Sequence, residues 1–227
     1  MEMYGEEWAA RFEDWANASI AGRDGLFRLA DTALADLPEN ARVLVVGCGT
    51  GSEILALASR HASWEFEAVD LSGEMLGLCQ RRLSAAGVAR RVTLHHRSVE
   101  GLRVAPCDAA TAILVSQHIV DDPGASRFFS EIAANLVDGA PLFSADISLP
   151  DEAVKREAVL QVWRHQAVTA GLPVEAPENL ISRFGRDLRA RSPAHIEELL
   201  SGAGFCSPLL VFQSTMYRAW ISRLVLS

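Results

Sequence analysis

The first forty residues place apolar side chains three and four positions apart, a spacing that predicts amphipathic helices. Gly22 and Gly25 interrupt the series and divide it into two helices, and Pro38 ends it. We therefore expect a helical segment over residues 1–40. The positions that carry the pattern are Trp8, Phe12, Trp15, Leu26, Phe27, Leu29, Ala30, Ala33 and Leu34.

From Arg42 the pattern changes to short apolar runs that alternate with helical stretches. Helical spacing recurs between the runs, at residues 52–60, 72–86 and 126–136. This alternation predicts βαβ units, and hence a parallel sheet with helices on both faces. The runs typical of buried strands cover residues 42–46, 64–69, 92–95, 107–116 and 141–147.

The alternation stops after Pro150. Residues 150–194 show helical spacing around Trp163 and several prolines, which together predict a helical insertion. Another helix starts at Pro193, because proline is favoured in the first helical turn. Two strand-like runs, 208–213 and 216–226, then end the sequence, and the short turn between them requires antiparallel pairing.

A glycine-rich turn, Gly47-Cys48-Gly49-Thr50-Gly51, lies between the first predicted strand and the next helix. Glycines at such a turn let the backbone approach a ligand closely, and the helix N-terminus favours a negative group. Asp70 ends the following strand, where a carboxylate can bind ribose hydroxyls. The combination predicts a nucleoside site at the carboxyl edge of the sheet. Ser52 occupies the position of the third glycine of a dinucleotide fingerprint, which argues against NAD.

These segments resemble motifs one and two of the class I S-adenosylmethionine-dependent methyltransferases. The resemblance is carried by residues 43–51, by 69–72 with Met75 and Leu76, by 108–115, and by the late Leu-Leu-x-x-Ala-Gly-Phe run at 199–205. It implies an α/β, Rossmann-like fold with a seven-stranded, mostly parallel sheet of order 3-2-1-4-5-7-6 and an antiparallel strand 7. We accordingly expect a single domain comprising a helical cap (1–40), a cofactor-binding core (41–149), a helical lid or insertion (150–194) and a C-terminal helix with strands 6 and 7 (195–227).

The resemblance also implies roles for individual residues toward S-adenosylmethionine, whose demethylated product is S-adenosylhomocysteine. The loop residues Gly47, Cys48, Gly49, Thr50 and Gly51 would lie against the methionyl part, and Asp70 would hold the ribose. Leu71 and Met75 would pack on the adenine. The family usually places an acidic residue after strand 3, whereas this chain has Arg97, Ser98 and Val99 there. Ser116 and Gln117 would approach the sulfonium side.

His118 is the candidate general base, because it follows the fourth strand where the acceptor is expected. Methyl transfer is an in-line displacement, so a base is needed only when the acceptor must lose a proton. The alternative, which we favour, is a histidine that packs against or hydrogen-bonds the cofactor. No metal is expected, because His95 and His96 are adjacent on a strand and point to opposite faces.

The variable segments supply the candidate substrate-binding residues Tyr4, Trp163, Arg183 and Phe184. The N-terminal helices and the insertion can close over the carboxyl edge as a lid, although helix packing is the more common role for such aromatics. The arginines at 183, 186, 189 and 191 fit either an anionic acceptor or a solvated face.

Composition narrows the class of partner. The 227 residues are 49% hydrophobic and carry a net charge of −8, so a core can form and nucleic acid is not the default partner. No apolar run approaches a membrane span, and the spacing of the four cysteines is typical of free thiols in a reducing cytoplasm. We expect a small-molecule acceptor methylated on O, N or C, and a monomer or homodimer.

Two other functions remain open. The tail segments 212–214 and 217–220 resemble the ending of carboxy-S-adenosylmethionine synthases, which make a modified cofactor for tRNA modification. A regulatory protein that binds S-adenosylmethionine without catalysis would show the same motifs.

Overall fold

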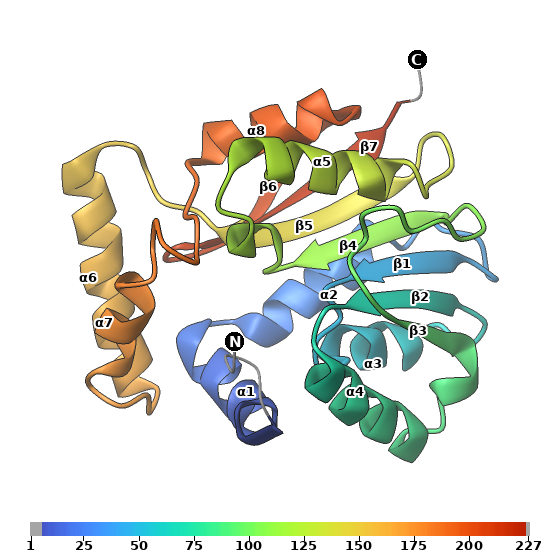
Figure 1. Ribbon diagram of the computed structural model, residues 1–227, viewed down its shortest axis with the longest axis horizontal. Helices are drawn as coiled ribbons and strands as arrows, with labels where there is room; N and C mark the ends of the chain where they lie inside the picture. The colour runs from blue at the N-terminus through green and yellow to red at the C-terminus, as the bar shows by residue number, and fades with distance from the viewer. Residues whose placement is uncertain (1–5, 226–227) are drawn as a thin grey trace.

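The computed structural model describes the backbone of residues 6–225 and the side chains of residues 11–225. Its sheet has seven strands in the order β3-β2-β1-β4-β5-β7-β6, and β7 runs antiparallel to both β5 and β6 (Figure 1). The sheet order and the antiparallel strand 7 are therefore confirmed. The strands are β1 (Arg42–Val46), β2 (Glu65–Asp70), β3 (Val92–His96), β4 (Ala109–Ile113), β5 (Pro141–Ile147), β6 (Phe205–Ser214) and β7 (Tyr217–Leu224).

Helices cover both faces of this sheet. One face packs on α5 (Asp122–Ala133) and α8 (Pro193–Gly202) through an apolar cluster that includes Phe129, Ile196 and Trp220. The opposite face packs on α2 (Arg23–Ala33), α3 (Ser52–Ala58) and α4 (Gly73–Ala85). All seven residues of β5 are buried, as expected for a central strand covered on both sides.

Three helices stand at the carboxyl ends of the parallel strands: α1 (Glu6–Ser19), α6 (Ala153–Thr169) and α7 (Ala176–Ile181) (Figure 1). Trp163 joins two of them, since its ring is fully buried and its Nε1 donates to the Ser19 carbonyl at 3.0 Å. Gln166 adds a hydrogen bond to the Ala18 carbonyl at 2.8 Å. The insertion and the N-terminal helix therefore pack on each other at this edge of the sheet.

Several element ends differ from the sequence prediction for local reasons. Helix α5 begins at Asp122 rather than 126, because Asp121 caps it by accepting a hydrogen bond from the Gly124 amide at 2.7 Å. The fourth strand ends at Ile113 because Leu114 adopts a left-handed backbone with φ of 62°. The short 3-10 helix η2 (Ser116–His118) follows it.

No helix in the described part of the chain combines the length and apolar character needed to cross a membrane.

Candidate cofactor and acceptor site

The glycine loop between β1 and α3 is held by the neighbouring strand. The amides of Gly47 and Cys48 both donate to the Val69 carbonyl, at 2.7 and 3.0 Å. All three loop glycines have positive φ, of 68° at Gly47, 51° at Gly49 and 81° at Gly51. Side chains with a β-carbon rarely adopt this conformation, so the loop shape requires glycine.

The three glycines differ in what surrounds them. A β-carbon at Gly47 would lie 2.3 Å from Val115 Cγ2, and one at Gly51 would lie 2.6 Å from Cys79 Sγ. A β-carbon at Gly49 would meet no described heavy atom within 4 Å. Gly47 and Gly51 are thus required by packing, whereas Gly49 leaves its backbone open to a ligand.

Asp70, at the end of β2, is oriented by two backbone amides. Its Oδ2 accepts from the Gly49 amide and its Oδ1 from the Ser72 amide, each at 2.8 Å. A carboxylate oxygen has two lone pairs, so each retains an acceptor position for a ribose hydroxyl. The segment after Asp70 is fixed by His96, whose Nε2 lies 3.1 Å from the Leu71 carbonyl.

The predicted adenine-contacting side chains differ in exposure. Leu71 is 73% exposed although it is a large apolar residue, whereas Met75 and Val99 are buried. Ser98 accepts a hydrogen bond from the Glu100 amide at 3.1 Å, and the Arg97 guanidinium donates to the Glu100 carbonyl at 3.1 Å. The exposed Leu71 suits a flat apolar group such as adenine, and Arg97 is used within its own loop.

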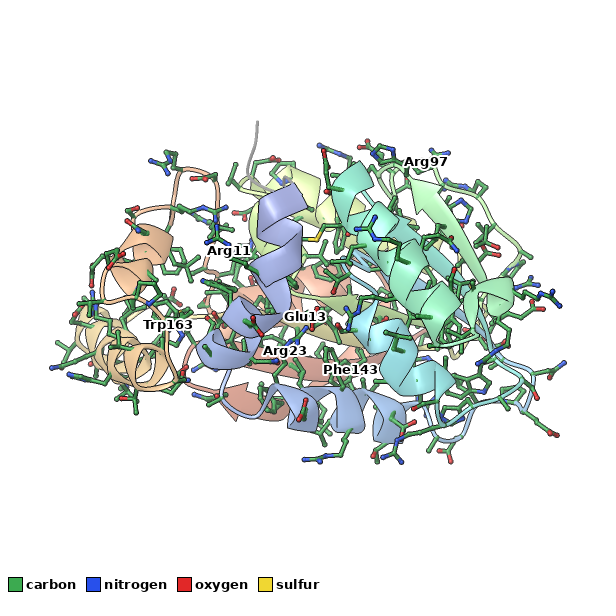
Figure 2. All side chains as sticks on the ribbon, turned by 90° about the horizontal axis from the view of Figure 1, so that it is seen from below. Arg11, Glu13, Arg23, Arg97, Phe143 and Trp163 are labelled. Atoms are coloured by element: carbon green, nitrogen blue, oxygen red, sulfur yellow. The ribbon has the colours of Figure 1, made fainter. Side chains whose placement is uncertain are left out.

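A further set of residues, absent from the sequence prediction, ties α1 to the glycine loop. Glu13 accepts a hydrogen bond from the Thr50 hydroxyl and pairs with Arg23 at 2.9 Å (Figure 2). Arg82 on α4 donates to the Thr50 carbonyl at 2.9 Å and to Ser52 Oγ at 2.8 Å. Burial alone would raise the pKa of Glu13, but hydrogen bonds from Arg23, Thr50 and Ser52 outweigh it and lower the pKa to about 2. No local motif signals this contact, because Glu13 and Thr50 are 37 residues apart.

The turn after β4 is built on a buried carboxyl group. The Gln117 amide donates to Asp146 Oδ1 at 3.0 Å, and the Gln117 side-chain oxygen accepts from the Ile147 amide at 2.9 Å. Burial raises the pKa of Asp146 to about 7, although hydrogen bonds from Ser116 and Gln117 and the charge of Arg191 oppose the shift. Ser116 and Gln117 therefore have structural partners, and Gln117 directs its oxygen to β5.

His118 follows these residues with solvent access to its side chain. Protein packed around the imidazole and the nearby Arg183 charge lower the pKa of His118 to about 4, against an opposing effect of Asp187. The ring is therefore neutral at pH 7. A pKa of about 4 is lower than a general base at neutral pH favours, which supports a hydrogen-bonding or packing role. The catalytic role of His118 stays a prediction.

The insertion places its candidate residues in different surroundings. Trp163 lies in the core, where its packing on α1 accounts for its burial (Figure 2). Arg183 pairs with Asp187 at 3.0 Å in the loop that follows α7, and Phe184 is half-buried beside it. Tyr4 lies outside the described residues.

Among the side chains that the structure describes, there is no group of three histidine, cysteine or carboxylate residues that could hold a metal ion. His95 instead pairs with Glu67 at 2.7 Å.

Comparison with known proteins supports a methyltransferase assignment. A methyltransferase-domain family model matches residues 43–139. A carboxy-S-adenosyl-L-methionine synthase of Campylobacter hominis is 21% identical over 97% of this chain and 93% of its own length. A malonyl-[acyl-carrier protein] O-methyltransferase of Magnetococcus marinus is 30% identical, but the match covers 63% of this chain and only 48% of that protein.

Solved structures confirm the fold. A possible exported protein of Bordetella parapertussis superposes with a TM-score of 0.71 and 23% identity, over 90% of this chain and 67% of its own. The match over residues 43–139 and the sheet order support a methyltransferase domain of the class I fold, with S-adenosylmethionine as its cofactor.

Proposed function

We propose that this protein transfers a methyl group from S-adenosylmethionine to a small-molecule acceptor held between η2 and the insertion. The observation that carries the proposal is the hydrogen bond from the Gly49 amide to Asp70. It places the Asp70 carboxylate, which can accept further hydrogen bonds, beside a glycine that has open space for a ligand. When bound, S-adenosylmethionine supplies an electrophilic methyl carbon. The chain contributes orientation of the nucleoside and exclusion of water.

The residues present fit such a nucleoside. Asp70 is held in place to accept from a ribose diol, the exposed Leu71 offers an apolar surface, and Gly49 has the space that a close backbone approach requires. We propose that Met75, Ser98 and Val99 contact the adenine. The neutral His118 then contacts the acceptor or the cofactor by hydrogen bonding.

Calorimetry with S-adenosylmethionine, S-adenosylhomocysteine and NADH tests the cofactor assignment. We expect the two sulfur nucleosides to bind and NADH not to bind. Asp70→Ala should weaken S-adenosylhomocysteine binding by roughly 1–3 kcal/mol, because it removes the ribose acceptor and leaves two loop amides without their partner. Asp36→Ala, at an exposed surface position, is the matched control. NADH binding in place of the sulfur nucleosides would contradict the proposal.

A carboxy-S-adenosylmethionine synthase activity is the second candidate, favoured by the match to the Campylobacter hominis synthase along almost the whole chain. Mass spectrometry of the nucleoside released during turnover separates the two. A methyltransferase releases S-adenosylhomocysteine, whereas the synthase product is S-adenosylmethionine with a carboxylate in place of one methyl hydrogen. Cofactor binding without either product across an acceptor library would favour the regulatory alternative.

The cytoplasm is the compartment we propose. All four cysteines are free thiols, and three of them are buried, an arrangement suited to a reducing environment.

A further inference from the structure

A cavity of about 240 Å³ lies where the start of α6 faces the loop of residues 182–191. We propose that it binds the anionic group of a small organic acid, so that the methyl acceptor carries a carboxylate or phosphate on an apolar body. This inference rests on the proposed methyl transfer and defines the class of acceptor. The lining residues are Leu149, Arg156, Phe184, Gly185, Arg189 and Ala190.

The arginines around this cavity differ in whether a carboxylate neutralises them. Arg183 and Arg186 share Asp187, at 3.0 and 2.8 Å. In the same region Arg164 pairs with two glutamates, at 2.7 and 2.6 Å, and Arg191 pairs with Asp122 at 3.0 Å. These four guanidinium groups already have anionic partners within the fold.

Among the described side chains, the two arginines that line the cavity have no such partner. Among the side chains of residues 11–225, no carboxylate oxygen lies within 4.0 Å of the Arg156 or Arg189 guanidinium. Arg156 donates instead to the carbonyls of Pro150 and Asp151, at 3.0 and 3.3 Å, which orient its guanidinium without neutralising it. The field of Arg189 reaches Asp122 and contributes to lowering its pKa, but the two form no ion pair. Two positive charges at one cavity favour a negative ligand.

The remaining walls are apolar. Leu149 is buried, and Phe184 and Ala190 pack against the cluster that joins α6 and α7 to the sheet edge. An apolar or aromatic body can therefore pack against these side chains while its acidic group meets the guanidinium groups, as in most small-molecule sites. A fully polar ligand would leave this wall without a complementary surface.

The cavity adjoins the turn that carries His118. The Arg189 amide donates to the Gln117 carbonyl at 2.7 Å, one residue before His118. Arg183, next to the cavity residue Phe184, is close enough to help lower the pKa of His118. The loop of residues 182–191 thus connects the cavity to the expected acceptor position, where it can anchor the acid group while another part of the molecule is methylated.

The test uses a library of matched pairs in which each aromatic or aliphatic carboxylate has its neutral carboxamide, with phosphate monoesters as a third arm. Ligand-observed NMR with the full chain and saturating S-adenosylhomocysteine measures binding. We expect the acids to bind at least about tenfold more tightly than their amides, because a carboxylate forms charge-assisted hydrogen bonds with a guanidinium group and a neutral carboxamide does not. The carboxylate and phosphate arms identify which acid the cavity prefers.

Three variants make the test specific. Arg156→Gln with Arg189→Gln should abolish the preference for acids and leave S-adenosylhomocysteine affinity unchanged. Arg186→Gln, which alters a paired and 71% exposed arginine, should keep the preference. Equal binding of acids and amides, persistence of the preference in the double variant, or an absence of acidic ligands would each overturn the inference. Failure of the wild-type protein to bind S-adenosylhomocysteine would instead contradict the proposed function, and acid binding can be measured separately without the nucleoside.

Discussion

On the cofactor side, Asp70 contacts Gly49 across 21 residues, and both lie at the ends of adjacent parallel strands. On the proposed acceptor side, Arg191 donates to the Ile119 carbonyl across 72 residues, and the insertion reaches α1 through Trp163. The cofactor side is thus formed by neighbouring parts of the chain: a strand, a turn and the next strand. The acceptor side is an assembly of distant segments, and its shape depends on helix packing.

The largest expected effect concerns the acceptor side. Trp163→Ala should lower the free energy of unfolding by about 3–5 kcal/mol, because it empties a fully buried indole site and strands the Ser19 carbonyl. Chemical denaturation measures this change. Trp163→Phe retains most of the packing and should lose clearly less. If Trp163→Ala abolished acceptor binding at unchanged stability, Trp163 would be a substrate contact and the comparison would fail.

The next effect separates two glycines of the cofactor loop. Gly47→Ala should destabilise the fold by roughly 2–5 kcal/mol, since its positive φ and its 2.3 Å approach to Val115 both oppose a β-carbon. Gly49→Ala has only the backbone strain, about 1–2 kcal/mol, but should lose most cofactor affinity. Denaturation and calorimetry on both variants measure the contrast. Equal losses of stability in the two variants would contradict the prediction that Gly47 is required by packing and Gly49 by ligand approach.

A third prediction concerns Glu53, which follows the glycine loop on α3. This side chain is buried, and its Oε1 has no hydrogen-bond partner among the described atoms. Burial raises the pKa of Glu53 from 4.5 to about 7, against an opposing effect of the Thr111 hydroxyl. Its stabilising contribution is therefore complete below pH 4.5 and is lost as the pH rises through 7.

Glu53→Gln should accordingly be more stable than the wild type at pH 8, by roughly 3 kcal/mol, with the difference shrinking toward pH 4.5. Urea unfolding across this range measures the difference. Glu39→Gln, at an exposed position, is the control and should show no such trend. A difference that does not vary with pH would rule out ionisation of Glu53 as its cause.

The smallest expected effect is at Glu13, where α1 meets the glycine loop. Because the pKa of Glu13 is lowered from 4.5 to about 2, its contribution is present above pH 4.5 and is lost as the pH falls toward 2. Glu13→Gln should cost about 1 kcal/mol at pH 7 and weaken S-adenosylhomocysteine binding slightly. Calorimetry at pH 7 and unfolding between pH 2 and 5 measure both. A loss of affinity as large as that of Asp70→Ala would make α1 an integral part of the cofactor side.

Sequence reasoning predicted most of the fold, because the strands repeat a strong apolar pattern and the glycine loop has a fixed relation to Asp70. Its errors fall where a single residue changes the backbone. Leu114 enters the left-handed region and shortens β4, and the Asp121 cap starts α5 four residues early. Neither event changes the periodicity of the apolar pattern, so periodicity did not reveal them.

The site was predicted unevenly. The glycine turn and the strand end that carries Asp70 form as predicted, and their cofactor roles stay predictions. Glu13 and Asp146 were missed because their partners are distant in sequence. The sequence alone did not distinguish the roles of arginines 183, 186, 189 and 191. Only the fold shows that three of them pair with carboxylates while Arg189 lines a cavity with Arg156.

The sequence by itself determined the βαβ order, the glycine turn and the acidic residue that follows it, since these depend on neighbours along one or two strands. Tertiary structure decided which helix covers the loop, which carboxyl groups are buried and which arginines pair with a carboxylate. Ion pairing and burial depend on distances between segments that packing brings together, and a charge is neutralised only when its partner arrives within a few ångströms.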